Sequence, residues 1–404
     1  MGSGAFLGWL GSVWALARYG IPALPILARL WLRRTDRQRA AERALRGLLR
    51  AQEAEPQTPP LTSLGGDVYE VDVGALCPQA PTADGPRAVT VVHLLGSGET
   101  RLSPLPGLQA LIAADPGLAT HRHLIADTPM EAAAFLGPEA FIERLLRNLT
   151  PHLDDGGPVV LMGLSRGALA SLEIACRVGI EQQRPIAALA LSPPARADYE
   201  WPRSVTNIAS LEASTRAVVE LGRMPGFIER FTERRMRHIF MAFSAWVMAE
   251  LSFATEQTLG WVACEALQRP PAQLCLRAVR EFSLLTRVPD TELRHAYSSI
   301  AERAAACPHV KLTVCWGQDD VWIPAQPAKE RVDAALQRHG ADADRIQTLV
   351  LAGWNHGIGR ELDKDFAPLA TRVRAHCEWV ARQHAELTGR APDMIEGQHD
   401  ARRG

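Results

Sequence analysis

The sequence predicts an α/β protein with a mostly parallel sheet flanked by helices, an inserted helical cap, and an apolar and then basic helical extension at the N-terminus. Three short apolar runs, at residues 159–162, 310–316 and 346–351, have the length and composition of buried parallel strands. Each run opens into a loop that contains glycine, and residues 168–175 then change to helical periodicity.

The first of these runs leads directly into a Gly-x-Ser-x-Gly motif. Gly163 and Gly167 lack the Cβ atoms that would crowd a sharp turn from strand to helix. Such a turn holds the hydroxyl of Ser165 at the carboxyl edge of the sheet, in a strained conformation suited to a nucleophile. A glycine-flanked surface turn is the alternative, and it is disfavoured by the strand before the motif and the helix after it.

A serine hydroxyl is a weak nucleophile, so this motif requires a base and a group that orients the base. Asp320 follows the second apolar run and His356 follows the third. A carboxylate at the end of a strand can accept a hydrogen bond from an imidazole and fix its tautomer. Asp320 alone has the ordinary interpretation of a helix N-cap, and His356 that of a loop histidine. The order serine, aspartate, histidine, each after a strand, predicts a catalytic triad. Asp319 is the competing acid.

On these motifs the chain resembles the α/β-hydrolase superfamily over residues 65–195 and 305–388. It matches the nucleophile elbow at Ser165, the Gly-x-x-Asp-x-x-x-Pro acid loop at Asp320 and the Gly-x-x-His ending at His356. The resemblance implies that Ser165 is the nucleophile, His356 the general base and then acid, and Asp320 the orienting carboxylate. In the acid loop of the family, the spacing from Gly317 and to Pro324 favours Asp320 over Asp319. It implies no dissociable cofactor.

An oxyanion hole needs backbone N–H groups that point to where negative charge develops on a tetrahedral intermediate. Arg166, directly after the nucleophile, is one expected donor. The resemblance makes Ser97 the other donor, in the glycine loop after the apolar run at residues 88–95, with Leu95 as an alternative. The chain has Leu-Gly where the family commonly has His-Gly, and its histidine, His93, comes earlier. His93 either points into the site or is satisfied by a backbone carbonyl.

A helical insertion is expected after the strand-like run at residues 186–194, where the resembled family inserts cap or lid domains. Its middle, residues 239–253, is apolar on more than one helical face, so it is either a cap core or the wall of an apolar tunnel. The substrate-binding candidates are His93, Leu95, Phe240, Phe243, Trp246 and Trp354.

The N-terminal segment carries aromatic residues that favour a membrane–water boundary at residues 5–32. Arginine and proline interrupt this apolar stretch, so a regular membrane span is not expected, and no basic region precedes it as in a secretory signal. The basic helix that follows would rest on anionic lipid headgroups, so residues 5–50 are expected to associate with the cytoplasmic side of a bacterial inner membrane. The alternative is packing on the protein's own cap or on a second subunit of a homo-oligomer.

The composition excludes other classes of protein. With 404 residues, 47% of them hydrophobic, and a formal net charge of −1, the chain lacks the charge balance of a nucleic-acid-binding protein. Seven cysteines without paired spacing disfavour a disulfide framework, and the absence of metal-site and nucleotide-loop motifs predicts neither metal nor cofactor. The expected division is an extension at 1–52, a linker at 53–64, a core at 65–195, a cap at 196–304, a second core part at 305–388 and a tail at 389–404.

These observations together predict a serine hydrolase that cleaves a small-molecule ester or thioester with a hydrophobic acyl group. A serine at the elbow argues against dehalogenase and epoxide-hydrolase chemistry, and against cysteine-dependent polyester synthases. An acyltransferase with the same triad is one alternative. A non-catalytic protein that binds a lipophilic ligand is the other.

Overall fold

The computed structural model describes residues 35–81, 89–129, 138–153, 156–195, 253–270 and 290–389, with scattered residues between 237 and 281. The apolar segment expected at residues 5–32 and the tail from residue 390 lie outside the described residues. So do two of the substrate-binding candidates, Phe243 and Trp246, and the first part of the expected cap.

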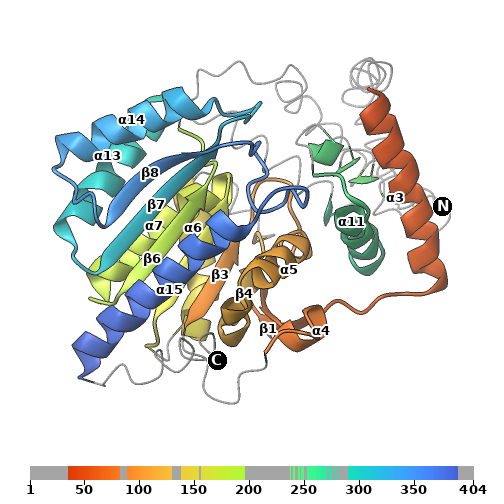
Figure 1. Cartoon of the computed structure of the whole chain (residues 1–404), viewed down its shortest axis with the longest axis horizontal. Helices are drawn as coiled ribbons and strands as arrows, with labels where there is room; N and C mark the ends of the chain where they lie inside the picture. The colour runs from red at the N-terminus through yellow and green to blue at the C-terminus, as the bar shows by residue number, and fades with distance from the viewer. Residues whose placement is uncertain are drawn as a thin grey trace, which may run out of the picture.

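An eight-stranded sheet forms the centre of the described structure, in the order β1-β2-β4-β3-β5-β6-β7-β8 (Figure 1). The strands are β1 (Leu61–Gly65), β2 (Val68–Val71), β3 (Thr90–Leu94), β4 (Arg122–Ala126), β5 (Val159–Leu164), β6 (Ile186–Leu191), β7 (Val310–Gly317) and β8 (Ile346–Leu351). β2 pairs antiparallel with both β1 and β4, whereas all other neighbours pair in parallel. The predicted mostly parallel α/β sheet is therefore confirmed.

Helices cover both faces of this sheet (Figure 1). One layer contains α5 (Leu105–Ala114) and α15 (Ala367–Thr388), and the other contains α6 (Pro138–Leu153), α7 (Arg166–Glu181), α13 (Asp290–Ala306) and α14 (Ala325–Arg338). Shorter helices are α4 (Val73–Leu76) and the 3-10 helix η2 (Pro116–Thr120).

β5 shows why these apolar runs form strands inside the molecule. Every residue of β5 is buried, and its side chains alternate between the two layers, as the period of a strand requires. Val160 and Met162 pack toward α5 and α15, whereas Val159 and Leu161 pack toward the opposite helices. A continuous apolar run therefore satisfies both faces of the sheet.

The described part of the N-terminal extension is α3 (Asp36–Ala54), which packs on α11 (Glu256–Gln268) from the insertion (Figure 1). The Thr35 hydroxyl accepts a hydrogen bond from the N–H of Gln38, whose side chain accepts one from the N–H of Thr35. This reciprocal cap fixes the start of the helix. β1 begins at Leu61, within the segment expected to be a linker. None of the helices in the described part of the chain has both the length and the apolar character needed to cross a membrane.

Candidate active site

Ser165 lies in a tight turn between β5 and α7, with φ of 53° and ψ of −117°. Its backbone N–H donates to the carbonyl of Leu191 at 2.7 Å. Side chains at the flanking glycines would not fit, because a Cβ at Gly163 would lie 2.1 Å from the carbonyl oxygen of Gly167. A Cβ at Gly167 would in turn lie 2.4 Å from the carbonyl oxygen of Leu94. The motif therefore forms the strained strand-to-helix turn that the sequence predicts.

The loops after β7 and β8 bring a carboxylate and an imidazole together. Nδ1 of His356 lies 2.8 Å from Oδ2 of Asp320, and both side chains are buried. The other carboxylate oxygen of Asp320 accepts hydrogen bonds from the backbone N–H groups of Trp322 and Ile323, both at 2.8 Å. Asp319, the competing acid, is exposed to solvent. The geometry thus pairs His356 with Asp320.

Asn355 and Glu361 support the histidine loop. The side-chain oxygen of Asn355 accepts hydrogen bonds from the backbone N–H groups of His356, at 2.7 Å, and of Val321, at 3.1 Å. The backbone N–H of Asn355 in turn donates to the carboxylate of Glu361 at 3.0 Å. Burial raises the pKa of Glu361 to about 7. Sequence reasoning missed both residues, and only the position of Asn355 next to the histidine was a signal.

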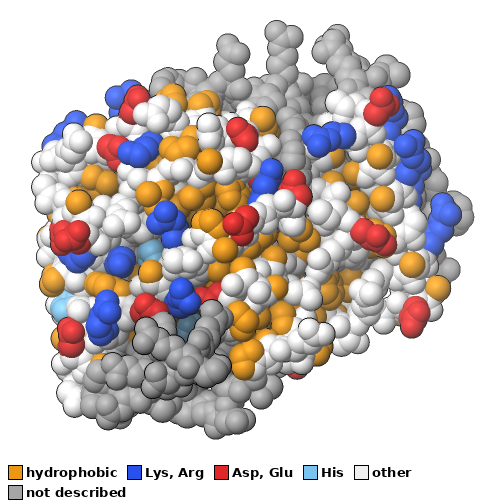
Figure 2. All heavy atoms as spheres, viewed as in Figure 1, with side chains coloured by type: hydrophobic (Ala, Val, Ile, Leu, Met, Phe, Trp, Pro, Cys, Tyr) orange, Lys and Arg blue, Asp and Glu red, His pale blue; other side chains and the backbone are white. Residues whose placement is uncertain are grey.

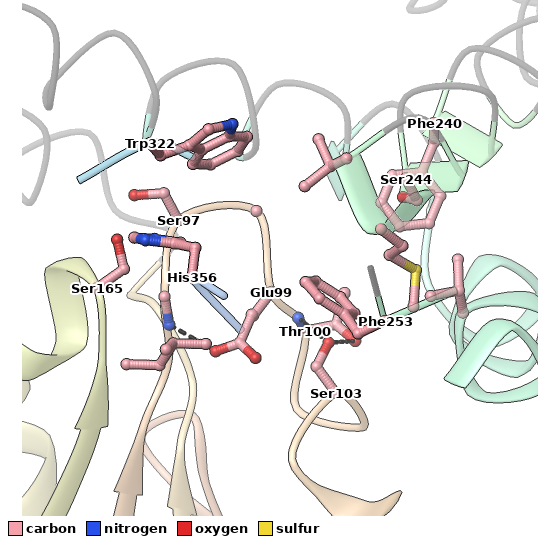
Figure 3. Close-up of a pocket in the computed structure, with 16 residues that line it drawn as sticks. Ser97, Glu99, Thr100, Ser103, Ser165, Phe240, Ser244, Phe253, Trp322 and His356 are labelled. Carbon is pink, nitrogen blue, oxygen red and sulfur yellow. Dashed lines mark hydrogen bonds between the residues drawn. The ribbon is translucent and has the colours of Figure 1, made fainter. Parts of the chain in front are cut away.

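Ser165 and His356 line one cavity of about 50 Å³, and Figure 3 shows their side chains beside each other. The ring of Trp322 packs against that of His356, with 5.2 Å between the ring centroids. The remaining wall is mostly apolar and comes largely from the insertion, through Phe240, Val247, Met248, Phe253 and Val262. Besides Ser165, four hydroxyl-bearing residues also line the cavity, Ser97, Thr100, Ser103 and Ser244, together with Gly96, Gly98, Glu99 and Leu164.

Two backbone N–H groups beside the cavity are available to an oxyanion. In the loop after β3, the N–H of Gly96 donates to Glu99 at 2.6 Å and that of Gly98 donates to Glu281 at 2.5 Å. Within the described part of the chain, no hydrogen bond occupies the N–H of Ser97 between them, nor that of Arg166. Arg166 is the first residue of α7, where the helix dipole favours negative charge.

Three substrate-binding candidates lie in the packed interior and do not line this cavity. His93 is buried on β3 with Nε2 3.2 Å from Nδ1 of His123, and burial lowers the pKa of His93 well below its usual value. Leu95 packs in the layer of α5 and α15, and Trp354 contacts Phe366 edge to face at 5.3 Å. Of the candidates on the insertion, Phe240 lines the cavity.

Charged side chains are buried behind the Ser97 loop, and the sequence carries no signal for them. The ion pairs are Arg166–Glu281, Arg277–Glu281, Arg277–Asp127, Arg269–Asp127, Arg269–Glu265, Arg101–Glu265 and Arg360–Glu99. We call this set the buried ion-pair network. No group of three or more His, Cys, Asp or Glu side chains in the described ranges is arranged to hold a metal ion.

No protein-family model and no curated protein sequence matches this chain. Among solved structures, it resembles a carboxylesterase of the thaumarchaeon Nitrososphaera gargenis at 13% identity, over 79% of this chain and 99% of that one, with a TM-score of 0.44. An esterase from Thermogutta terrifontis is 16% identical over 80% of this chain and 98% of that one, with a TM-score of 0.40. The Cif epoxide hydrolase from Acinetobacter nosocomialis is 13% identical over 83% of this chain and 96% of that one, with a TM-score of 0.47.

Proposed function

We propose that this chain, which has the α/β-hydrolase fold, is a serine hydrolase that cleaves a carboxylic ester or thioester. One observation carries the proposal. The buried hydrogen bond between Asp320 and Nδ1 of His356 leaves Nε2 as the ring nitrogen without a hydrogen bond among the described residues, and His356 lines the same cavity as the strained Ser165. This is the arrangement that activates a serine hydroxyl.

In the proposed mechanism, the hydroxyl of Ser165 attacks the acyl carbonyl while Nε2 of His356 takes its proton. Asp320 stabilises the imidazolium that forms. The backbone N–H groups of Arg166 and Ser97 bind the oxyanion of the tetrahedral intermediate. His356 then protonates the leaving alcohol or thiol, and in the second half it activates the water that releases the acid from the acyl-enzyme.

The lining of the cavity favours an apolar acyl group. Phe240, Phe253 and Val262 present hydrocarbon to the cavity that Ser165 also lines, and burying apolar substrate surface there stabilises the complex by roughly 25 cal/mol per Å². A serine in place of aspartate at the elbow argues against the chemistry of the epoxide hydrolase that the fold resembles. Both alternatives, acyl transfer and non-catalytic binding of a lipophilic ligand, are outcomes of the test below.

The test is labelling with a fluorophosphonate probe, comparing wild type with Ser165→Ala, together with hydrolysis of p-nitrophenyl esters of increasing acyl length. We expect labelling that disappears in Ser165→Ala, and turnover that depends on acyl length. Products analysed with a competing alcohol or amine separate hydrolysis from acyl transfer. A folded wild type that neither reacts with the probe nor turns over any ester would refute the hydrolase proposal and favour the binding protein.

We propose further that the surface of α3 binds an anionic membrane. Its apolar face is occupied by α11, and its outer face exposes Arg39, Arg43 and Arg50. Figure 2 shows basic side chains along this edge of the molecule. Cosedimentation with phosphatidylserine vesicles decides between membrane binding and a homo-oligomer. Vesicle binding by the wild type that is weaker in Arg43→Glu and Arg50→Glu would support membrane binding. Salt-independent self-association without vesicle binding would instead support a homo-oligomer.

A further inference from the structure

Glu281 is a fully buried carboxylate that contacts both sides of the expected oxyanion hole. One of its oxygens accepts the backbone N–H of Gly98 at 2.5 Å. Its other oxygen lies 3.1 Å from Nη2 of Arg166. Gly98 directly follows Ser97, and Arg166 directly follows the nucleophile. A single carboxylate from the insertion therefore joins the two segments that carry the expected oxyanion donors.

Arg277, from the same part of the insertion, completes this link. Its Nε lies 3.1 Å from Glu281, and its guanidinium also donates to the backbone carbonyl of Glu99. Asp127, after β4, forms an ion pair with Arg277, with its Oδ1 2.7 Å from Nη1. Glu281 and Arg277 thus hold two peptide groups of the loop, through the N–H of Gly98 and the carbonyl of Glu99.

Among the described residues, this arrangement leaves the N–H of Ser97 as the one backbone donor of residues 96–99 that is open to a ligand. Figure 3 shows the loop carrying Ser97 and Glu99 beside the serine and histidine side chains. The N–H of Gly96 is held by Glu99, and Glu99 by Arg360 at 2.7 Å. With Gly98 held by Glu281, the loop is anchored on both sides of Ser97. The conformation also depends on Gly98 itself, whose φ is +80°.

Burying so many charges is not an efficient way to stabilise a cap on a core. Each ion loses its hydration, and well-packed apolar residues in place of a buried ion pair are often as stable or more so. The carboxylate of Glu281 instead fixes the orientation of the groups it binds, because a charge-assisted hydrogen bond constrains its partner more tightly than an apolar contact does.

We propose that Glu281 is a positioning residue that sets the distance between the two backbone donors of the oxyanion hole. The inference rests on the proposed hydrolase function. It means that the oxyanion hole is complete only when the inserted segment is seated on the core. Both the insertion and the sheet then fix the position of the loop after β3 relative to the elbow at Ser165.

The chain offers a matched control in Glu265. This carboxylate is also fully buried, also belongs to the insertion and also joins the buried ion-pair network, through Arg101 at 3.2 Å and Arg269 at 2.9 Å. Glu265 contacts neither Gly98 nor Arg166 in the described structure. Neutralising Glu265 therefore removes a buried charge of the same network without touching the oxyanion donors.

The experiment compares Glu281→Gln, Glu281→Asp and Glu265→Gln in the full-length protein. A glutamine at position 281 has one acceptor oxygen and must lose either Gly98 or Arg166. An aspartate keeps the charge but is one methylene too short to reach both. The readouts are kcat and KM for a p-nitrophenyl ester, the inhibition constant of an alkyl trifluoromethyl ketone, and the melting temperature. The ketone adduct carries the oxyanion that the donors bind.

We expect both variants of Glu281 to lose about 100-fold in kcat with little change in KM, since misplacing a donor by about 1 Å costs that much. Affinity for the ketone falls by a similar factor. Glu265→Gln should lower the melting temperature about as much as the Glu281 variants do, but it should keep the wild-type kcat and ketone affinity. A purely structural role does not produce this separation.

Three results would overturn the proposal. The first is wild-type kcat and ketone affinity in a folded Glu281 variant. The second is an equal kcat loss in Glu265→Gln, which would assign the effect to general loss of stability. If Glu281→Gln does not fold, Glu281→Asp decides on the same criteria. The third is a wild type that the fluorophosphonate does not label, which refutes the hydrolase function itself and removes the basis of the inference.

Discussion

Replacing Asp320 by asparagine tests the proposed triad directly, because the structure predicts which hydrogen bonds survive. One oxygen of Asp320 accepts from the N–H groups of Trp322 and Ile323, each at 2.8 Å. The carbonyl oxygen of an asparagine retains both bonds, so the loop stays in place. The amide NH₂ then occupies the position of the other oxygen, 2.8 Å from Nδ1 of His356.

Two donors cannot face each other at that distance in a buried site. Nδ1 of His356 must therefore become the acceptor, and the ring proton moves to Nε2. In the wild type, Nε2 is the nitrogen that accepts the proton of Ser165 in the proposed mechanism. A histidine with its proton on Nε2 is no longer a base for the serine. The equivalent change in a Ser-His-Asp enzyme lowers kcat by about 10⁴, or about 5 kcal/mol of activation free energy.

The assay is initial-rate hydrolysis of a p-nitrophenyl ester, with the melting temperature measured in parallel. We expect Asp320→Asn to melt near the wild-type temperature and to lose about 10⁴ in kcat. Asp319→Asn is the matched control, since the adjacent carboxylate is exposed and should be dispensable. The reasoning fails if folded Asp320→Asn keeps kcat within about tenfold of wild type, or if Asp319→Asn shows the larger loss.

Three further predictions concern the elbow, the histidine loop and the cavity. Gly163→Ala should lower the melting temperature and abolish labelling by the fluorophosphonate probe, because the added Cβ would lie 2.1 Å from a carbonyl oxygen. Gly47→Ala is the control: its Cβ would meet no atom within 4 Å, so it should stabilise α3 by about 0.5–1 kcal/mol. Equal melting temperatures of the two variants would contradict this prediction. The pKa of Glu361 rises from 4.5 to about 7 on folding, so the folded state holds the proton more tightly than the unfolded state. The contribution of Glu361 to stability should therefore fall as pH rises from about 4.5 to 7, whereas His93, His121 and His376, whose pKa values burial lowers, contribute in the opposite direction. The stability of wild type relative to Glu361→Gln, from urea titrations at each pH, should decrease across this range; a difference that does not change with pH would contradict the raised pKa of Glu361. Phe240→Ala should shift the preferred p-nitrophenyl ester to a longer acyl chain, because it removes an aromatic ring from the cavity wall; an unchanged optimum would place the acyl group elsewhere.

Several site predictions from the sequence depended on which way a side chain faces, and local pattern does not decide this. The sequence makes Leu95 a candidate for substrate binding. Its side chain instead joins the hydrophobic layer of α5 and α15. His93 and Trp354 are likewise interior residues, held by His123 and Phe366. Proximity to a motif along the chain therefore did not imply access to the cavity.

The sequence by itself determined the parallel sheet and the strained turn at Ser165. Both follow from local causes: continuous apolar runs need burial on both faces, and the close approach to Gly163 excludes any side chain. The spacing of Gly317 and Pro324 already favours Asp320 over Asp319, but only the tertiary structure brings Asp320 to 2.8 Å from His356, 36 positions later in the chain. The tertiary structure alone placed Glu281 against Gly98, 183 positions earlier in the chain. A contact of that separation is fixed by how the layers pack, which leaves no periodicity or spacing in the sequence from which it can be predicted.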